Sequence, residues 1–265
     1  MTLLNNILPE KRRKILREKL EAGEFIRAME AHNGLSGIVA NNACIKGETI
    51  EGAIRREFDA IWESSLTDSA SKGHPDIEVI SVDSRIHTIN EILSVTNKPM
   101  IVDGDTGGEA NNFEYTVSKL ERAGVSAVVI EDKVFPKRNS LESGVQQTLE
   151  DPHVFANKIK RGKKVQSRKD FMIIARIEAL IAGMGMEVAI ERARIYLETG
   201  VDGVRIHSKS KEPEEILDFA RRYKILSTEL KAVKPLVCVP TTYNTITEEQ
   251  LKTAGFNMVI HANHL

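Results

Sequence analysis

Eight short apolar segments, each followed at once by polar or charged residues, recur along the sequence with segments of helical character between them. We predict β-strands for these eight segments, at residues 25–30, 58–62, 99–102, 125–130, 172–175, 203–206, 236–239 and 258–260. Strands that alternate with helices are typical of parallel sheets. An open, doubly wound sheet is the alternative, but it rarely has polar residues after every strand, and the sequence carries no glycine-rich dinucleotide fingerprint and no P-loop. The pattern therefore predicts an α/β fold, a (β/α)8 barrel.

Helices are predicted where the sequence shows good helix formers and recognisable ends, at residues 9–22, 84–95, 113–123, 151–162, 186–199, 213–223 and 247–254. Asp151 is the expected N-cap of one helix, Thr247 and Gln250 form a capping-box pattern in another, and Gly124 is expected to end a third. We expect the helix at 9–22 to pack across one end of the barrel. Residues 37–57 show no clear period and are expected to form a helical start followed by an exposed excursion.

The length of 265 residues suits one (β/α)8 domain over residues 1–265. The sequence stops at Leu265, directly after the last predicted strand, whereas a (β/α)8 barrel needs an eighth helix. We therefore expect the C-terminal helix to be missing from this sequence and the natural polypeptide to be longer.

Composition excludes several classes of protein. The formal net charge is −1, so no bulk field favours nucleic acid or a membrane surface as a partner. Cys44 and Cys238 lie far apart and outside any metal-binding pattern, which indicates a reducing, cytoplasmic location without disulfides. The first 20 residues are charged and have no apolar signal-peptide core, and no segment is long and apolar enough to span a bilayer.

Carboxylates follow two neighbouring strands of the predicted barrel. Asp103 and Asp105 come after one strand, and Glu131 ends the next. Because parallel strands deliver their carboxyl ends to one rim, these side chains predict an oxygen-rich site for a hard divalent cation. Lys133 and Lys137 follow closely and could meet an anion. The alternative is a set of surface turns with solvated charges.

Other polar residues fall at the same rim, and they comprise Glu30, Asn33, Ser64, Ser65, Asp76, Lys133, Arg176, Glu178, His207, Ser208 and Asn263. Arg176 follows an apolar run directly, and a guanidinium in that position needs an anion. His207 alone would more often be a packed, hydrogen-bonded residue. Asp132 is interpreted as a structural residue that pairs with Lys133.

Five motifs occur in one order, namely Ala31-His32-Asn33-Gly34-Leu35-Ser36, Asp103-Gly104-Asp105-Thr106-Gly107, Glu131-Asp132-Lys133-Val134-Phe135-Pro136-Lys137-Arg138-Asn139-Ser140-Leu141, Ala175-Arg176-Ile177-Glu178-Ala179 and Ala262-Asn263-His264. Together they resemble the phosphoenolpyruvate mutase family, a part of the isocitrate lyase superfamily. The similarity runs from about Phe25 to the last residue and is most specific in the third motif.

The resemblance implies roles for individual residues. Asp103 would be the direct Mg²⁺ ligand, with Asp105 and Glu131 holding the ion through water. The substrate carboxylate would meet Trp62, Ser64, Ser65 and Leu66, although the family usually has Gly where Ser65 stands. The phosphoryl group would be held by Asn139, Arg176 and His207, beneath a closing loop that includes Lys137, Asn139, Ser140 and Leu141. Asp76 would lie beside the reacting carbon atoms.

The implied activity is the Mg²⁺-dependent interconversion of phosphoenolpyruvate and phosphonopyruvate, which forms the C–P bond of phosphonate biosynthesis. The implied assembly is a homo-oligomer, a dimer or a tetramer, with a small-molecule substrate as its partner. Three alternatives stay open. A phosphonopyruvate hydrolase shares the fold and substrate but typically has Thr at the position of Asn139. A C–C lyase of the superfamily is disfavoured because its loop cysteine is absent here. A non-catalytic barrel could simply bind an organic phosphate.

Overall fold

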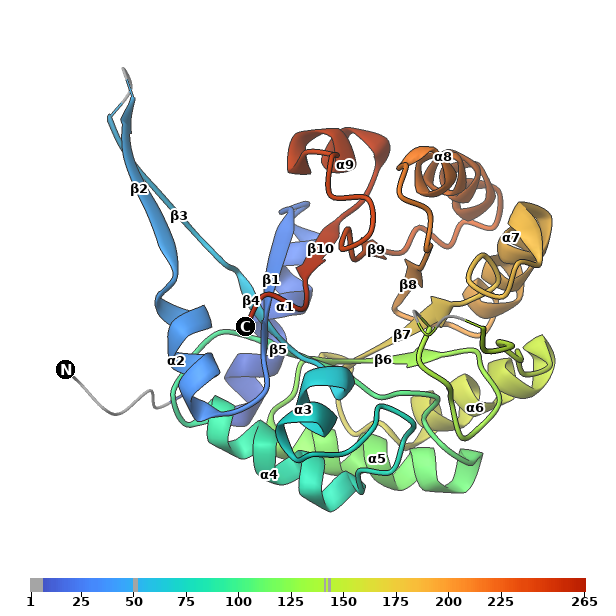
Figure 1. Ribbon diagram of the computed structural model, residues 1–265, viewed down its shortest axis with the longest axis horizontal. Helices are drawn as coiled ribbons and strands as arrows, with labels where there is room; N and C mark the ends of the chain where they lie inside the picture. Colours follow the sequence, from blue (N-terminus) through green and yellow to red (C-terminus); the bar gives the residue numbers. More distant parts are fainter. Residues whose placement is uncertain (1–6, 50–51, 141, 143) are drawn as a thin grey trace.

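The computed structural model describes residues 7–49, 52–140, 142 and 144–265. Within these residues, eight parallel strands close a barrel in the order β1, β4, β5, β6, β7, β8, β9, β10 (Figure 1). The barrel strands are β1 (Ile26–Ala31), β4 (Ala60–Glu63), β5 (Met100–Asp103), β6 (Ala127–Glu131), β7 (Met172–Ile177), β8 (Gly203–Ile206), β9 (Leu236–Cys238) and β10 (Met258–His261). The closed parallel barrel confirms the predicted (β/α)8 fold, and each predicted strand matches one barrel strand to within two residues at either end.

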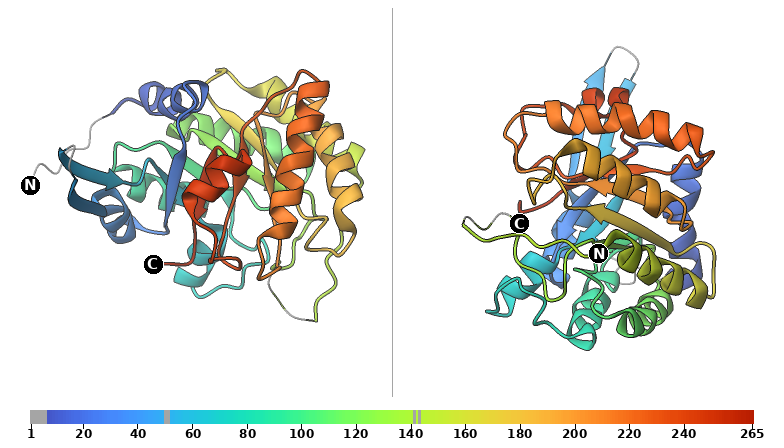
Figure 2. Two further views of the ribbon diagram at one scale, coloured as in Figure 1. Left: turned by 90° about the horizontal axis from the view of Figure 1, so that it is seen from above. Right: turned by 90° about the vertical axis from the view of Figure 1, so that its right-hand side faces the viewer.

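Helices surround the barrel and connect its strands (Figures 1 and 2). In the described part of the chain they are α1 (Pro9–Glu21), α2 (Gly34–Asn42), α3 (Ser65–Ser71), α4 (Val82–Leu93), α5 (Ala110–Ala123), α6 (Pro152–Val165), α7 (Gly185–Leu197), α8 (Glu214–Glu229) and α9 (Glu248–Ala254). None of these helices combines the length and apolar character that crossing a lipid bilayer requires. The sequence did not predict α3, because this helix has only seven residues and its three serines and one aspartate are poor helix formers.

Helix ends follow the predicted capping signals. The Asp151 carboxylate accepts hydrogen bonds from two backbone N–H groups at the start of α6, and Thr247 and Gln250 form a reciprocal capping box on α9. Gly124 ends α5 at a φ of +89°, in the left-handed region that glycine adopts readily. A Cβ atom at Gly124 would lie 2.9 Å from Pro9, so this glycine also allows α1 to approach the barrel closely.

The structure confirms the helical start predicted in residues 37–57 and shows that the excursion after it is a β-hairpin. Helix α2 continues to Asn42, and the chain then forms an antiparallel hairpin of β2 (Cys44–Thr49) and β3 (Gly52–Glu57). This hairpin extends away from the barrel (Figure 1; Figure 2, right). Its segment contains several charged residues and glycines and no sustained apolar alternation, so it lacks the usual pattern of a half-buried strand.

Side chains that point into the barrel determine where the site lies. Successive strand residues point to opposite faces, so Ile101 and Asp103 on β5 share the inward face, as do Val129 and Glu131 on β6. The apolar members of this inward set pack with Leu16 of α1, which confirms that α1 covers one end of the barrel. At the opposite end the inward positions become polar, and the site is built there.

Candidate active site

A cavity of about 70 Å³ opens at the carboxyl ends of the barrel strands. Its lining consists of Trp62, Ser64, Ser65, Leu66, Asp76, Asp103, Lys137, Asn139, Ser140, Arg176, Arg205, His207, Val239, Thr241, Thr242, Ala262 and Asn263. Of the residues that the sequence singled out for the site, Asp105 and Glu131 lie beside this lining, and Leu141 falls outside the described residues. The structure therefore brings the residues expected to bind substrate or to act in catalysis together around one cavity, whereas the rim residues Glu30, Asn33, Lys133, Glu178 and Ser208 do not line it.

The acidic wall of the cavity is built on the turn after β5. The Ser65 hydroxyl donates a hydrogen bond to Asp103 Oδ2 at 3.1 Å, and the backbone N–H of Asp105 approaches Asp103 Oδ1 at 3.3 Å. Gly104 makes this turn possible, because a Cβ atom there would lie 2.7 Å from Val128 Cγ2 and 2.9 Å from Ile130 Cγ2. The turn therefore presents Asp103 to the cavity and turns Asp105 aside.

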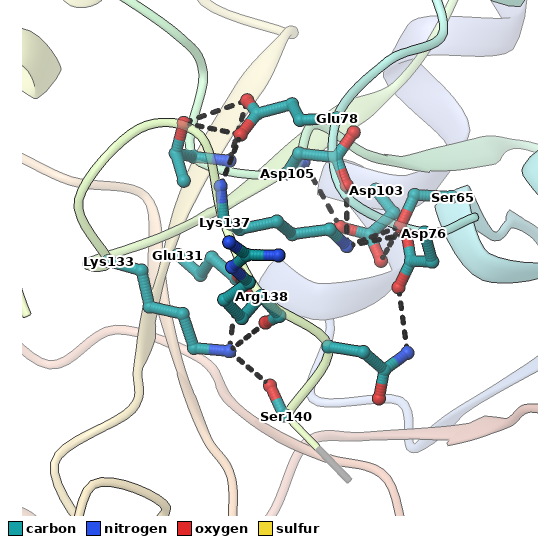
Figure 3. A network of polar contacts seen from close by, with 12 residues as sticks. Ser65, Asp76, Glu78, Asp103, Asp105, Glu131, Lys133, Lys137, Arg138 and Ser140 are labelled. Carbon is teal, nitrogen blue, oxygen red and sulfur yellow. Dashed lines mark hydrogen bonds and ion pairs between the residues drawn. The ribbon is translucent and has the colours of Figure 1, made fainter. Parts of the chain in front are cut away.

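The Lys137 ammonium group lies among these carboxylates (Figure 3). Its Nζ atom is 2.7 Å from Asp105 Oδ1, 2.8 Å from Asp76 Oδ1 and 3.0 Å from Ser65 Oγ. Burial alone would lower the pKa of Lys137, but the surrounding carboxylates outweigh it and raise that pKa, so the lysine stays charged. Burial would likewise raise the pKa of Asp105, but Lys137 and Arg85 hold it at about 2. The loop after β6 thus reaches across to the wall formed by the β5 turn.

The residues present fit a divalent cation held mainly by substrate and water. Among the described residues, no three carboxylate, imidazole or thiol groups come close enough together to hold an ion by themselves, so the three predicted carboxylates do not form a preformed cage. Asp103 nevertheless faces the cavity, and the buried carboxylates of Asp105 and Glu131 lie beside it, where Lys137 and Arg176 balance their charge. Mg²⁺ usually takes one or two protein carboxylates and keeps several waters.

A second network of charges joins β6 to β7. Glu131 Oε2 lies 2.9 Å from Arg176 Nη1, and Glu131 Oε1 lies 3.5 Å from Lys133 Nζ. Glu178 accepts a hydrogen bond from Arg176 Nε and lies 3.1 Å from Lys133 Nζ. The Lys133 ammonium group also donates to the hydroxyl of Ser140 in the loop that follows β6. These contacts hold the Arg176 guanidinium at the cavity wall.

His207 is kept neutral at the same wall. Its Nδ1 atom lies 2.7 Å from Glu178 Oε1 and 2.8 Å from Arg176 Nη2. The Glu178 carboxylate is ionised, because Arg176 and His207 outweigh its burial and hold its pKa well below the usual range. Glu178 would accept a proton from Nδ1, whereas the Arg176 guanidinium would donate one to it, so the two contacts favour opposite tautomers of the neutral imidazole. Burial, with Arg176 adding to it, lowers the pKa of His207 to about 4.

Arg205 is a site residue that the sequence reading missed. It lies on β8, two residues before His207 and therefore on the same inward face. Its side chain stacks on Trp62, with the guanidinium carbon 5.4 Å from the ring centroid. Only 4% of Arg205 is exposed, and its Nε and Nη1 atoms have no hydrogen-bond partner among the described residues. Two arginines and a histidine therefore form an anion-binding wall.

Asn139 also lines the cavity. Its amide nitrogen donates to Asp76 Oδ2 at 3.0 Å, and Asp76 Oδ1 lies 2.8 Å from Lys137 Nζ. Asp76 therefore holds two side chains of the loop after β6, although it belongs to the segment between α3 and α4. The predicted closing loop is in contact with the rest of the site.

The expected pairing of Asp132 with Lys133 is wrong. Asp132 Oδ2 instead lies 2.9 Å from Arg192 Nη1 and accepts a hydrogen bond from the Tyr196 hydroxyl, both on α7. The reason is strand alternation, because Asp132 and Lys133 point to opposite faces after β6. Asp132 is structural, as expected, but it ties the strand end to the outer helices.

Three charged residues behind the cavity, Arg85, Glu63 and Glu78, were not among the site residues predicted from the sequence. Arg85 on α4 lies 2.9 Å from Asp105 Oδ2 and donates to the backbone carbonyl of Asp103. Burial raises the pKa of Glu63 to about 8, and it raises the pKa of Glu78 to about 7 with a contribution from Asp105. Arg85 lies inside a helical segment, where the sequence shows only which face is apolar and not which strand end a long side chain will reach.

Comparisons with known proteins identify the family to which this chain is similar. The family model for phosphoenolpyruvate phosphomutase matches residues 16–265. A phosphoenolpyruvate phosphomutase from Tetrahymena pyriformis is 38% identical over 250 residues, which cover 94% of this chain and 77% of the relative. A phosphonopyruvate hydrolase from Variovorax sp. (strain Pal2) is also 38% identical, over 251 residues that cover 94% of this chain and 80% of the relative.

A solved structure of a phosphonopyruvate hydrolase in complex with oxalate and Mg²⁺ is similar to this chain, with a TM-score of 0.82 and 36% sequence identity. The match covers 96% of this chain and 81% of the hydrolase chain. The sequence and structure comparisons confirm the expected superfamily and the expectation of an enzyme. Because a model of the family matches nearly its whole length, the chain belongs to the phosphoenolpyruvate phosphomutase family.

Proposed function

We propose that the protein interconverts phosphonopyruvate and phosphoenolpyruvate by moving a phosphoryl group within one molecule. In the direction of phosphoenolpyruvate, the C–P bond at C3 breaks, its electron pair forms the enolate of pyruvate, and the enolate oxygen at C2 then bonds to phosphorus. No group leaves the site, so the enzyme is an isomerase. The proposal is carried by one cavity that is lined both by the acidic turn after β5 and by the anion-binding wall of Arg176, Arg205 and His207.

The acidic wall suits the pyruvate part of the substrate. Ser64 and Ser65 are buried at the cavity and can offer hydroxyl and backbone N–H groups to the substrate carboxylate, as the resemblance implies. Asp103 would hold Mg²⁺ directly, with Asp105 and Glu131 beside it. When bound, the ion would stabilise negative charge on the pyruvate oxygens as a Lewis acid.

The anion-binding wall suits the phosphoryl group. Arg176, Arg205 and His207 come from neighbouring strands and face the same cavity. Phosphoryl transfer through a loose transition state needs positioning and charge stabilisation more than a strong nucleophile. Arg205 has guanidinium donors without protein partners, and it supplies the free hydrogen-bonding capacity that such a group requires.

Water must be kept out, because it would capture the phosphoryl group as phosphate. Lys137 and Asn139 reach into the cavity from the loop after β6, and both are held by Asp76. A loop in this position excludes solvent and strengthens the electrostatic interactions inside. The small cavity of about 70 Å³ is consistent with this closed arrangement.

A phosphonopyruvate hydrolase is the second candidate, since a protein of that name is as similar in sequence as the mutase from Tetrahymena. Asn139 favours the mutase. Its amide can donate to a phosphoryl oxygen and retain the group while the pyruvate part turns, whereas a threonine hydroxyl would be shorter. Losing such a hydrogen bond to a charged group would cost about 2 kcal/mol, which is more than tenfold in rate.

Product analysis separates the two candidates. The protein would be incubated with phosphonopyruvate and Mg²⁺ while phosphorus NMR follows the products. We expect phosphoenolpyruvate, with inorganic phosphate as a minor product at most. Stoichiometric phosphate and pyruvate without phosphoenolpyruvate would establish the hydrolase, and no turnover at all would leave the non-catalytic barrel. A homo-oligomeric assembly and a cytoplasmic location stay predictions from the sequence.

A further inference from the structure

Glu78 occupies an unusual place beside the cavity. It lies in the segment between α3 and α4, two residues after Asp76, and it does not line the cavity. Its backbone φ is +65°, a conformation that residues other than glycine rarely adopt. A conformation of this kind persists only where surrounding contacts determine it. The contacts of the Glu78 carboxylate are therefore informative.

The carboxylate of Glu78 binds two other segments, the turn after β5 and the loop after β6 (Figure 3). Its Oε1 atom accepts hydrogen bonds from Thr106, at 2.7 Å from the hydroxyl and 3.2 Å from the backbone N–H. Its Oε2 atom accepts from the backbone N–H of Lys137 at 3.2 Å. Thr106 belongs to the turn that carries Asp103, so one side chain connects the acidic wall to the loop after β6.

These contacts complement those of Asp76. Asp76 holds the side chains of Lys137 and Asn139, and substrate or cation will compete for those groups inside the cavity. Glu78 holds the Lys137 backbone from outside the cavity, where nothing in the reaction competes. Residues 76–78 therefore bind the loop in two ways. Asp76 binds the side chains of Lys137 and Asn139, and Glu78 binds the backbone N–H of Lys137.

We propose that Glu78 is a positioning residue that fixes the loop after β6 in its closed position by binding the backbone of Lys137. It touches no substrate and acts through the placement of Lys137 and Asn139. This inference rests on the proposed function only for its kinetic consequence, because the position of the loop can be measured without substrate.

Two variants separate the contacts of Glu78. In Glu78→Gln one carboxylate oxygen becomes an amide NH₂. Because Thr106 offers two donors to Oε1 and Lys137 offers one to Oε2, the remaining oxygen stays with Thr106 and the NH₂ faces the Lys137 N–H. Thr106→Val removes the hydroxyl donor and leaves the bond to Lys137 in place. Glu91→Gln is the matched control, since Glu91 lies exposed on α4 and, within the described part of the chain, its carboxylate forms an ion pair with His87 alone.

Trypsin cleavage without substrate reports on the loop. Lys137 is buried and Arg138 is exposed, so cleavage after them becomes faster when the loop opens. Mass spectrometry would follow this cleavage together with cleavage after Arg221, an exposed residue on α8 that serves as the internal reference. We expect cleavage in the loop to be about tenfold faster in Glu78→Gln, less than threefold faster in Thr106→Val and unchanged in Glu91→Gln.

Kinetics provide the second readout. We expect kcat for phosphonopyruvate to fall about tenfold in Glu78→Gln, with KM changed less than threefold, because the loop residues act mainly on the reacting groups. Unchanged loop cleavage in Glu78→Gln would overturn the inference, whatever the reaction proves to be. Equal acceleration after Arg221 would also overturn it, because that result would mean general destabilisation. Faster loop cleavage in a protein that does not turn over phosphonopyruvate would support the loop contact and refute the proposed function instead.

Discussion

Replacing Arg205 by methionine should make the protein more stable and much less active. Burial, with Arg176 adding to it, lowers the pKa of Arg205 to about 10 from its usual 12.5. A difference of 2.5 units corresponds to about 3 kcal/mol of unfavourable free energy for the charged form in the folded state. The contact with Trp62 offsets about 1 kcal/mol of this. We therefore expect Arg205→Met to raise the free energy of unfolding by on the order of 1–2 kcal/mol.

The same change removes donors that the phosphoryl group would use. Two guanidinium nitrogens of Arg205 have no hydrogen-bond partner among the described residues, so binding a phosphoryl dianion would satisfy both. Charge-assisted hydrogen bonds of this kind contribute about 3 kcal/mol, and their loss should lower kcat/KM for phosphonopyruvate more than 100-fold. Denaturant unfolding and steady-state kinetics measure the two effects on the same preparation.

A surface arginine supplies the control. Arg221 on α8 has a side chain that is 72% exposed and pairs with Asp218, so Arg221→Met should change stability by less than about 0.5 kcal/mol and leave kcat/KM alone. The reasoning would be refuted if Arg205→Met lost more than 2 kcal/mol of stability, which would mean that Arg205 has a structural partner. A kcat/KM within threefold of the wild-type value would refute its place in the anion-binding wall.

Three further predictions concern the site and its supporting turn. His207 should titrate near pH 4 in the free protein, as followed by NMR of its imidazole, and its pKa should rise when inorganic phosphate binds. This folded-state pKa lies below the unfolded value of 6.5. The free energy of unfolding should therefore fall by up to about 3 kcal/mol as the pH drops from 6.5 toward 4, because His207 takes up a proton more readily in the unfolded chain. A His207 pKa near 6.5 would contradict this. Asp103→Asn should abolish Mg²⁺-dependent turnover of phosphonopyruvate, and near-normal activity at ordinary Mg²⁺ would show that Asp103 is not the ligand. Gly104→Ala should destabilise the protein by about 1–3 kcal/mol in thermal unfolding, because the new Cβ atom would lie 2.7 Å from a valine methyl carbon of β6. Gly47→Ala is the control and should have little effect, because Gly47 has open space around it. Equal effects of the two changes would contradict the close packing of the turn.

The barrel and most of the site could be predicted because both depend on short-range patterns. Side chains alternate between the two faces of a strand, so the residue that follows the last apolar inward residue by two positions also points inward. This rule predicts Asp103, Glu131 and Arg176 at the rim from their sequence positions alone, and the structure has them there. The same rule, extended back from His207 by two residues, would have found Arg205. A charged residue inside a predicted strand does not by itself indicate a site, because strands also carry charged residues on their solvent-facing side.

Other features depend on contacts that local patterns do not specify. The path of the loop after β6 places Lys137 between Asp76 and Asp105, and no periodicity describes such a loop. The sequence therefore predicted three carboxylates around a cation, whereas the structure inserts an ammonium group among them. The sequence does not indicate the hydrogen bonds of Glu78 for the same reason, since its partners Thr106 and Lys137 lie 28 and 59 positions away along the chain.

A crossover experiment tests the proposed transfer within one molecule most directly. Ordinary phosphonopyruvate would be mixed with phosphonopyruvate that carries ¹⁸O on its phosphoryl group and ¹³C in its pyruvate carbons, and mass spectrometry would analyse the phosphoenolpyruvate formed with Mg²⁺. If the cavity keeps the phosphoryl group beside its own pyruvate, the product will be either fully labelled or unlabelled. Phosphoenolpyruvate with only one of the two labels, or label recovered only in free phosphate and pyruvate, would contradict the proposed mutase.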